Sequence, residues 1–363
     1  MKKYNLLTKI LFFVFTVVIL IAAYELLAPK KYTLIYKINK HIVKSNIEDT
    51  KEKNLLYGSR SNEDVAPKTV EFAREGIDNI ALITMIKDED DIIYENLVWH
   101  FCVGFRKFVI VDNNSTDNTR LLVEKFKRQV LGKAIVVVID DPIIEYIQSQ
   151  VTTGAMLLAN SLWPKLDWVF PVDADEFWYP NVKLQSILDK TPSKSDVILT
   201  MQYQHVPIET VDHLNGAEHF YKNIKFRIKS LSGGLGKVAV RPGIDVIIAQ
   251  GNHSASSKTR NLNYFGGNIL GLDMRHFQMR STAQTEKKYW NGAKANILAQ
   301  KLGIISEGVG HHWTAFKEEV DRKGIKQSAI DRFNNSFQPK ESCIEDPLPM
   351  EQAFKLFKEL TDG

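Results

Sequence analysis

The chain has 363 residues, of which 44% are hydrophobic and 25% are charged, a composition typical of a globular protein with a sizeable core. The formal net charge of +4 is small, and no basic stripe is interleaved with aromatic residues, so the sequence argues against a nucleic-acid partner. The two cysteines, Cys102 and Cys343, lie far apart in the sequence, which excludes a disulfide framework and a zinc–thiolate site.

An apolar run near the N-terminus, from Ile10 to Ala28, predicts a membrane anchor. At 1.5 Å per residue a helix over this run is about 28 Å long, close to the thickness of a bilayer core. A cleaved signal peptide is the alternative, but its apolar core is normally only about 7–15 residues long, and no clear small-x-small cleavage site follows the run. We therefore expect a single-pass membrane protein anchored by residues 1–30. Lysines flank both ends of the run and leave its orientation open.

After the anchor, residues 31–76 are mostly polar and charged and are typical of a stem or linker. The globular pattern begins at about residue 77. We expect a catalytic or binding domain over residues 77–310 and a C-terminal helical extension over residues 311–363.

The first half of this domain alternates strand and helix patterns. The expected strands are 80–85, 107–112, 134–139 and 167–173, and the expected helices are 91–103, 116–130 and 147–163. Such alternation predicts βαβ crossovers and an α/β, Rossmann-like fold with a mostly parallel sheet flanked by helices. After Pro180 we expect strands at 197–203 and 237–241, loops at 232–236 and 251–271, and a helix at 284–302.

Ligands of parallel α/β sheets bind beyond the carboxyl ends of the strands. The segment Asp173-Ala-Asp175 follows an apolar strand, and places carboxylates with no neighbouring cation in the sequence at the rim of the sheet. In an extended chain both side chains point to the same face, where they would suit Mg²⁺ or Mn²⁺. The alternative is a solvated Asp-x-Asp triplet of the kind that arises by chance.

A second strand end carries Asp112, followed by Asn113, Asn114, Ser115 and Thr116. Ser115 or Thr116 could cap the following helix, which gives the segment a structural role. The Asp112 carboxylate could instead accept hydrogen bonds from a ribose or a base.

These segments, in order, resemble the signature of family-2-like glycosyltransferases, and most closely the branch that includes family 92. The resemblance covers about residues 79–292. Its motifs are Ile83–Glu89 (ITMIKDE), Val111–Asp117 (VDNNSTD), Val172–Phe177 (VDADEF), Gly236–Pro242 (GKVAVRP), Gly251–His253 (GNH) and Arg275–Ser281 (RHFQMRS). Asp88 stands where the family more often has Asn, and Asn113 where many members have a second Asp.

The resemblance implies a GT-A fold and a transfer from a nucleotide-sugar donor that inverts the anomeric centre, with Mn²⁺ or Mg²⁺ as cofactor. The implied donor-binding residues are Glu89, Asp112, Asn113, Asp173, Lys237 and Arg241, and the implied metal ligands are Asp173, Asp175 and His276. The acceptor would be a glycan, a lipid-linked molecule or a protein.

An inverting transfer also needs a general base to take the acceptor proton. Glu209 and Asp212 follow the metal segment and are the candidates, without a reason in the sequence to choose between them. Two other functions compete with the transferase: a catalytically silent GT-A-like domain that binds a glycan or nucleotide, and a metal-dependent phosphohydrolase. The intact Asp173/Asp175 pair argues against the first, and the lack of further Asp- or His-rich metal motifs at strand ends argues against the second.

Overall fold

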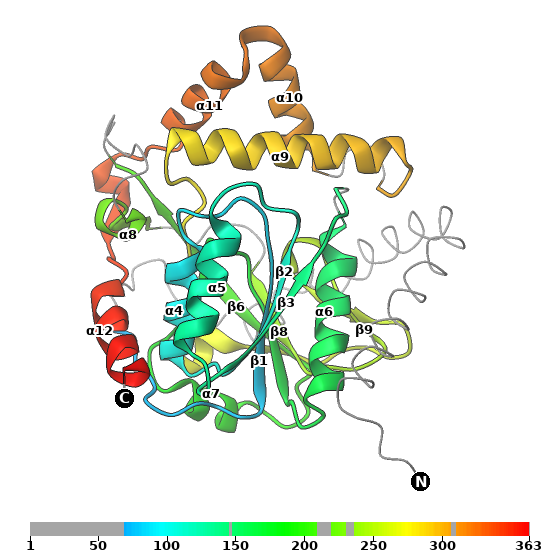
Figure 1. The fold of residues 1–363 in the computed structure, drawn as a ribbon, viewed down its shortest axis with the longest axis vertical. Helices are drawn as coiled ribbons and strands as arrows, with labels where there is room; N and C mark the ends of the chain where they lie inside the picture. The colour runs from blue at the N-terminus through cyan, green and yellow to red at the C-terminus, as the bar shows by residue number, and fades with distance from the viewer. Residues whose placement is uncertain (1–68, 145–146, 209–218, 230–235, 306–309, 363) are drawn as a thin grey trace.

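A computed structural model of the chain describes residues 69–144, 147–208, 219–229, 236–305 and 310–362 (Figure 1). The predicted anchor, most of the predicted stem, and the candidate bases Glu209 and Asp212 lie outside the described residues. Within the described ranges, no helix is both long enough and apolar enough to span a bilayer. Cys102 and Cys343 are both buried free thiols.

The first half of the domain has the predicted alternation of strands and helices. Neighbouring parallel strands follow the order β4-β1-β2-β3. The strands are β1 (Ile80–Ile86), β2 (Lys107–Asp112), β3 (Ile135–Asp140) and β4 (Trp168–Pro171). The helices between them are α4 (Ile93–Val103), α5 (Thr119–Gln129) and α6 (Gln148–Leu162), which confirms the helix and strand predictions for this half.

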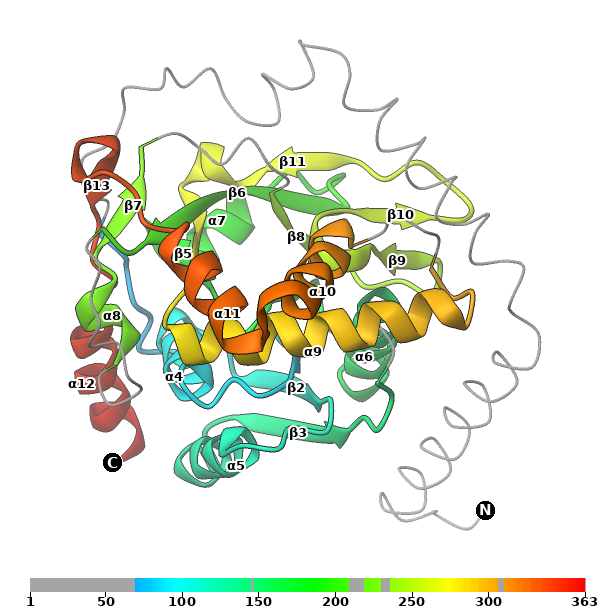
Figure 2. The ribbon, with the colours of Figure 1, turned by 90° about the horizontal axis from the view of Figure 1, so that it is seen from above.

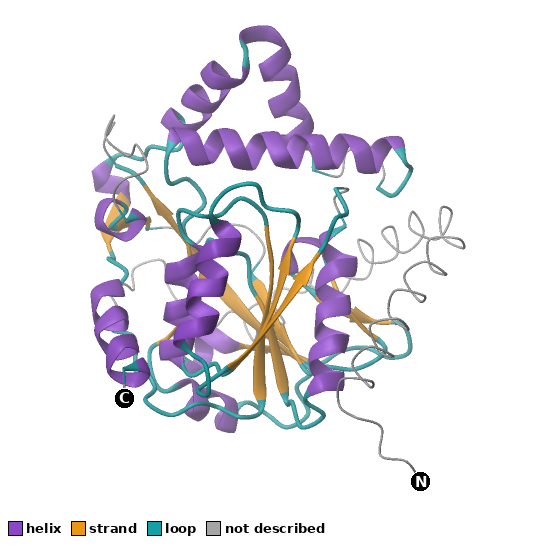
Figure 3. Cartoon of the chain, in the orientation of Figure 1, coloured by secondary structure: helices purple, strands orange, loops and turns teal. Residues whose placement is uncertain are grey.

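Alternate residues of β1 explain why the sheet is covered on both faces. Ile80 and Leu82 are fully buried in one apolar cluster with residues of α4 and α5. Ala81 and Ile83 are fully buried in a second cluster with residues of α6. A strand with two buried faces reads as a continuous apolar run, because successive side chains point to opposite sides. Figure 3 shows the strands between α4 and α5 on one side and α6 on the other.

The second half makes the sheet mixed, so the prediction of a mostly parallel sheet is wrong. β8 (Lys237–Val240) runs antiparallel to both β4 and β6 (Val197–Val206), and β5 (Glu176–Pro180) runs antiparallel to β12 (Leu272–His276). These pairings do not need the helical crossover that a parallel pair requires, so the βαβ pattern of the first half does not extend to them. The remaining strands of the sheet are β7 (Phe226–Ile228), β11 (Tyr264–Gly266) and β13 (Cys343–Glu345). Two short helices, α7 (Leu184–Lys190) and α8 (Phe220–Asn223), precede and follow β6 in the chain.

A separate two-stranded sheet joins β9 (Val246–Ile248) to β10 (Ala255–Ser257). The loop predicted over 251–271 therefore contains two short strands, β10 and β11. Their three-residue length is too short to give a periodic pattern in the sequence.

Helix α9 (Thr282–Lys301) lies across the carboxyl ends of the parallel strands, with α10 (His311–Lys323) and α11 (Ile325–Asn334) packed on its far side (Figures 1 and 2). The side chain of Ser281 caps α9 by accepting a hydrogen bond from the backbone N–H of Gln284, at 3.0 Å. Helix α12 (Met350–Thr361) packs instead on α4, where the rings of Phe357 and Phe101 meet edge to face. The end of the sheet that the sequence marks as the ligand side is therefore covered by α9.

Candidate functional site

The turn between β4 and β5 sets the directions of the two predicted metal-binding aspartates. β4 ends at Pro171 and β5 begins at Glu176, and the backbone carbonyl of Asp173 accepts a hydrogen bond from the N–H of Glu176 at 3.0 Å. Asp173 and Asp175 are thus not in an extended chain, so the reason given for placing both carboxylates on one face does not hold. The two side chains meet different partners.

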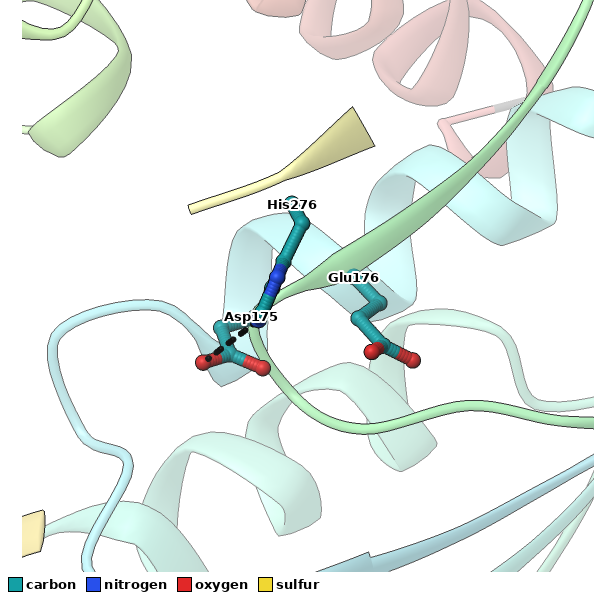
Figure 4. Close-up of side chains that lie close together, drawn as sticks. All are labelled: Asp175, Glu176 and His276. Atoms are coloured by element: carbon teal, nitrogen blue, oxygen red, sulfur yellow. Dashed lines mark ion pairs between the residues drawn. The ribbon is translucent and has the colours of Figure 1, made fainter. Parts of the chain in front are cut away.

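Asp175, Glu176 and His276 form a group that could hold a metal ion (Figure 4). One ligand atom from each residue lies within 4.8 Å of the others, and His276 Nε2 is 3.5 Å from Asp175 Oδ2. The antiparallel pairing of β12 with β5 places His276 directly opposite Glu176. The Oε1 atom of Gln204 lies 2.9 Å from His276 Nδ1, which holds the ring with Nε2 toward the carboxylates.

Of the predicted metal ligands, the structure brings Asp175 and His276 together, and it adds Glu176. The sequence signal for Glu176 was present, because it is the third acidic residue of the Asp-Ala-Asp-Glu segment. A mixed set of carboxylate and imidazole ligands is compatible with Mn²⁺, while Mg²⁺ prefers oxygen. The group therefore fits the predicted divalent cation.

Asp173 lies beside this group and is held by neutral and cationic donors. Its Oδ1 accepts hydrogen bonds from Gln148 Nε2 at 2.6 Å and Asn252 Nδ2 at 3.1 Å. Asn252 is almost fully buried in a left-handed backbone conformation with φ of 57°, and its Oδ1 has no hydrogen-bond partner among the described residues. An unpaired buried carbonyl is costly unless a ligand meets it, so Asn252 is a candidate ligand-binding residue that we did not predict.

Lys237 connects Asp173 to the metal group. Its Nζ lies 3.1 Å from Asp173 Oδ2 and 2.6 Å from Glu176 Oε1, and the side chain is almost fully buried. β8 runs antiparallel to β4, so its first residue lies at the same end of the sheet as Asp173. Arg241 follows the other end of β8, where it lies 4.4 Å above the Trp168 ring and 3.7 Å from Asp167. The structure therefore places Lys237 at the site and Arg241 away from it.

Cations from two further segments neutralise Asp175, so the carboxylates at this rim are not isolated. Lys288 on α9 forms an ion pair with Asp175 Oδ2, and Arg280 Nη1 lies 3.6 Å from the same oxygen. Arg280 also binds Glu89 at 2.6 Å and Asp91 at 2.7 Å. Glu89, a predicted donor-binding residue, is therefore connected to the site by its ion pair with Arg280. Arg280 belongs to a quoted motif, whereas nothing in the sequence pointed to Lys288.

The local charges shift the ionisation of the acidic residues in opposite directions. Burial by itself would raise the pKa of Asp175, but Lys288, His276 and Arg280 hold that pKa well below its ordinary value of 3.8. For Glu176, burial raises the pKa to about 7 against the opposing effect of Lys237. Burial likewise raises the pKa of Glu89 to about 7, against Arg280 and Lys288. Asp175 is therefore the carboxylate with the most firmly fixed negative charge.

Asp112 and Asn113 lie at the end of β2, at the same edge of the sheet. Asp112 is buried, and its Oδ1 accepts a hydrogen bond from the N–H of Ser115 at 3.0 Å. Asn113 donates to Asp141 Oδ2 at 2.9 Å, which ties β2 to the chain after β3. The expected cap is not formed by Ser115 or Thr116, because α5 begins at Thr119 and Thr116 instead binds Asp88 through its backbone N–H at 2.6 Å.

We expect the variant Asp112→Asn to separate nucleoside recognition from a turn role at this strand end. An asparagine oxygen can still accept the Ser115 bond, so a turn role predicts little change. If the carboxylate binds the nucleoside, a charge-assisted bond of about 1.5–3 kcal/mol is lost and affinity falls about ten- to a hundredfold. Calorimetric titration of nucleoside diphosphates with Mn²⁺ measures the affinity, and a melting curve measures the stability. Unchanged binding with little change in the melting temperature would assign Asp112 to the turn.

No curated protein sequence matches the chain. Among solved structures, the chain resembles Staphylococcus aureus TarS at 16% identity and a TM-score of 0.35, over 61% of this chain and 40% of TarS, so it spans well under two thirds of that protein. It also resembles the mannosyltransferase PcManGT from Pyrobaculum calidifontis in complex with GDP-Man and Mn²⁺, at 13% identity and a TM-score of 0.35, over 83% of this chain and 84% of that one.

A family model matches part of the chain. Residues 104–241, fewer than half of the chain, match the family described as Glycosyl transferase family 2. The matched segment runs from the end of α4 through β8 and contains Asp112, Asp173, Asp175, Glu176 and Lys237. This similarity supports the predicted resemblance to family 2 glycosyl transferases over this segment.

Proposed function

We propose that the chain transfers a sugar from a nucleotide-sugar donor to an acceptor hydroxyl, with inversion at the anomeric carbon and with Mn²⁺ or Mg²⁺ as cofactor. The observation that carries this proposal is the group of Asp175, Glu176 and His276 at the carboxyl edge of a sheet whose sequence matches family 2 glycosyl transferases. The finer resemblance to the family 92 branch belongs to the same proposal.

The fit of a divalent cation is supported by the chemistry of the ligand set. Asp175 and His276 offer Oδ2 and Nε2, and Glu176 offers a carboxylate oxygen from the adjacent position. A divalent cation bound there would neutralise charge on a departing nucleoside diphosphate. The ammonium of Lys288 already contacts Asp175, so a metal would compete with Lys288 for this carboxylate.

The chain's own cations would act on the same leaving group. Lys237, Lys288 and Arg280 are held near the carboxylates by ion pairs, so their positive charges are positioned before any substrate binds. Such preorganised charge lowers the barrier because it need not be reoriented as the diphosphate leaves. Glu209 and Asp212 remain the proposed general bases for the acceptor hydroxyl.

One assay distinguishes the proposed transferase from the two competing functions. We expect the full-length protein, incubated with a panel of nucleotide-sugars and Mn²⁺, to release a nucleoside diphosphate from at least one donor. Release of inorganic phosphate would support a phosphohydrolase instead. If no donor is turned over while one binds by calorimetry, the domain is a silent binder. The anomeric configuration of the product, read by NMR, tests inversion.

We also propose that residues 1–30 anchor the protein in a membrane, on the sequence pattern alone. Deletion of these residues should leave a protein that needs no detergent and melts cooperatively, because the polar stem separates the apolar run from the domain. Sedimentation of cell membranes should find the full-length chain in the pellet and the truncated chain in the supernatant. A truncated chain that aggregates without a cooperative melt would place the apolar run in the folded core.

A further inference from the structure

A pocket of about 380 Å³ lies beside the carboxylate site, between the start of α9, the chain after β1 and the chain after β2. Its lining includes Asp88, Ala283, Glu286, Trp290 and Asn291. This volume is at the small end of the range of about 300–1,000 Å³ that is usual for small-molecule sites. The pocket is therefore of a size to take a small compact ligand unit.

Hydrogen bonds between the elements hold the pocket in shape. Asp88, with a left-handed backbone φ of 53°, accepts from the N–H of Thr116 at 2.6 Å and from Asn291 Nδ2 at 2.7 Å. Nearby, Lys287 on α9 binds both Asp90 and Asp117, each at 3.0 Å. These bonds connect α9 to both strand-end loops, so the pocket is formed without a ligand.

Three polar groups in the lining have no hydrogen-bond partner among the described residues, while the Trp290 ring packs partly against the apolar cluster of α9, α10 and α11 and has Lys294 Nζ 5.8 Å from its centroid. The Glu286 carboxylate has no hydrogen-bond or ion-pair partner among the described residues, and the half-buried Trp290 donates its indole N–H to none of them. The Oδ1 atom of Asn291 likewise accepts nothing from the described part of the chain. An indole face beside a carboxylate and an amide suits a sugar ring, whose C–H face packs on the indole and whose hydroxyls donate to the oxygens.

The charges that line the pocket disfavour an anionic ligand. Of the charged residues that line it, two are acidic, Asp88 and Glu286, and one is basic, Lys287, whose ammonium is already paired with Asp90 and Asp117. An excess of negative charge repels a phosphate or a nucleoside diphosphate. The pocket therefore suits an uncharged polyhydroxylated ring and not the diphosphate of the donor.

Neighbouring residues place this pocket directly beside the proposed metal group. Asp88 lines the pocket while Glu89 binds Arg280, which approaches Asp175. On α9, Lys287 lines the pocket while Lys288 pairs with Asp175. On two separate elements, one residue thus faces the pocket and the next faces the carboxylate site.

We infer that this pocket binds a neutral sugar unit of the acceptor, so that the acceptor is a glycan or another glycosylated molecule. That the bound sugar belongs to the acceptor rests on the proposed transferase function. That the pocket binds a sugar rests on the pocket alone. Trp290 and Glu286 are the residues expected to determine specificity.

Saturation-transfer NMR tests the pocket directly. The full-length protein, kept in a detergent without a sugar head group, is titrated with methyl glycosides of glucose, galactose, mannose and N-acetylglucosamine. At least one glycoside should bind, and Ala283→Phe, an exposed position in the first turn of α9, should abolish that binding by filling the pocket. Glu286→Gln should weaken binding about tenfold, as expected for a lost charge-assisted bond.

The matched control is Glu318→Gln on α10, an exposed glutamate whose side chain also has no partner among the described residues. Its glycoside binding should equal that of the parent. Failure of every glycoside to bind, or binding that survives Ala283→Phe, would overturn the inference. Donor turnover is measured on the same samples. A further outcome is a protein that binds a glycoside, loses that binding in Ala283→Phe, and turns over no nucleotide-sugar. That result would support the sugar site but overturn both its role as an acceptor site and the proposed transferase.

Discussion

Replacing Asp175 with asparagine is expected to lower the rate of sugar transfer by at least about a hundredfold. The Asp175 carboxylate is nearly inaccessible, and its Oδ2 lies 3.5 Å from His276 Nε2 and also contacts Lys288. Its pKa is held well below the ordinary value, so the group is charged throughout the physiological range. Asparagine keeps the shape and removes the charge that a divalent cation needs. The measurement is the initial rate of nucleoside diphosphate release at saturating donor, with a calorimetric Mn²⁺ titration.

Two further variants separate this effect from a general loss of stability. Asp189→Asn on α7 is the matched control, because Asp189 is exposed and its side chain accepts from Gln185 at 2.8 Å on the same helix. Its rate should equal that of the parent. Lys288→Gln removes the ammonium that competes for Asp175, so it should bind Mn²⁺ more tightly than the parent. Full activity of Asp175→Asn, or of the parent protein in EDTA, would refute the metal-assisted mechanism.

Replacing Lys237 with methionine is expected to reduce the free energy of unfolding by about 3–5 kcal/mol. Lys237 lies 2.6 Å from Glu176 and 3.1 Å from Asp173, and both Lys237 and Glu176 are almost entirely buried. Methionine fills a similar volume but leaves the Glu176 carboxylate without its closest cation. Urea unfolding followed by circular dichroism measures the change, and the variant should also lose donor turnover.

The double variant Lys237→Met/Glu176→Gln should recover part of the lost stability, because it removes the unpaired carboxylate as well as the ammonium. Lys229→Met is the control: Lys229 is exposed, and its change should stay within about 0.5 kcal/mol. A Lys237→Met variant as stable as the parent would show that Lys237 does not compensate these buried carboxylates.

Much of the first half of the fold could be predicted from the sequence. Ile80–Ile86 and Lys107–Asp112 are continuous apolar runs of strand length, and the helices between the strands carry apolar residues at helical spacing. Such patterns report which faces of an element are buried, which is a local property. Because parallel strands carry their ligands beyond their carboxyl ends, the same patterns also located Asp112 and Asp173 at one edge of the sheet.

The composition of the site was decided by contacts between distant segments. The pairing of β12 with β5 brings His276 opposite Glu176, a hundred positions earlier in the chain, and α9 brings Lys288 to Asp175. The direction of β8 keeps Lys237 at the site and takes Arg241 to the opposite end of the strand. Strand direction, register and the crossing of a helix depend on side chains far apart in the sequence, whereas periodicity is a property of neighbours. The sequence by itself therefore indicated which edge carries the site and, through the family resemblance, named Asp175, His276 and Lys237 as candidates. Tertiary pairing decided that Glu176 and Lys288 join them and that Arg241 does not.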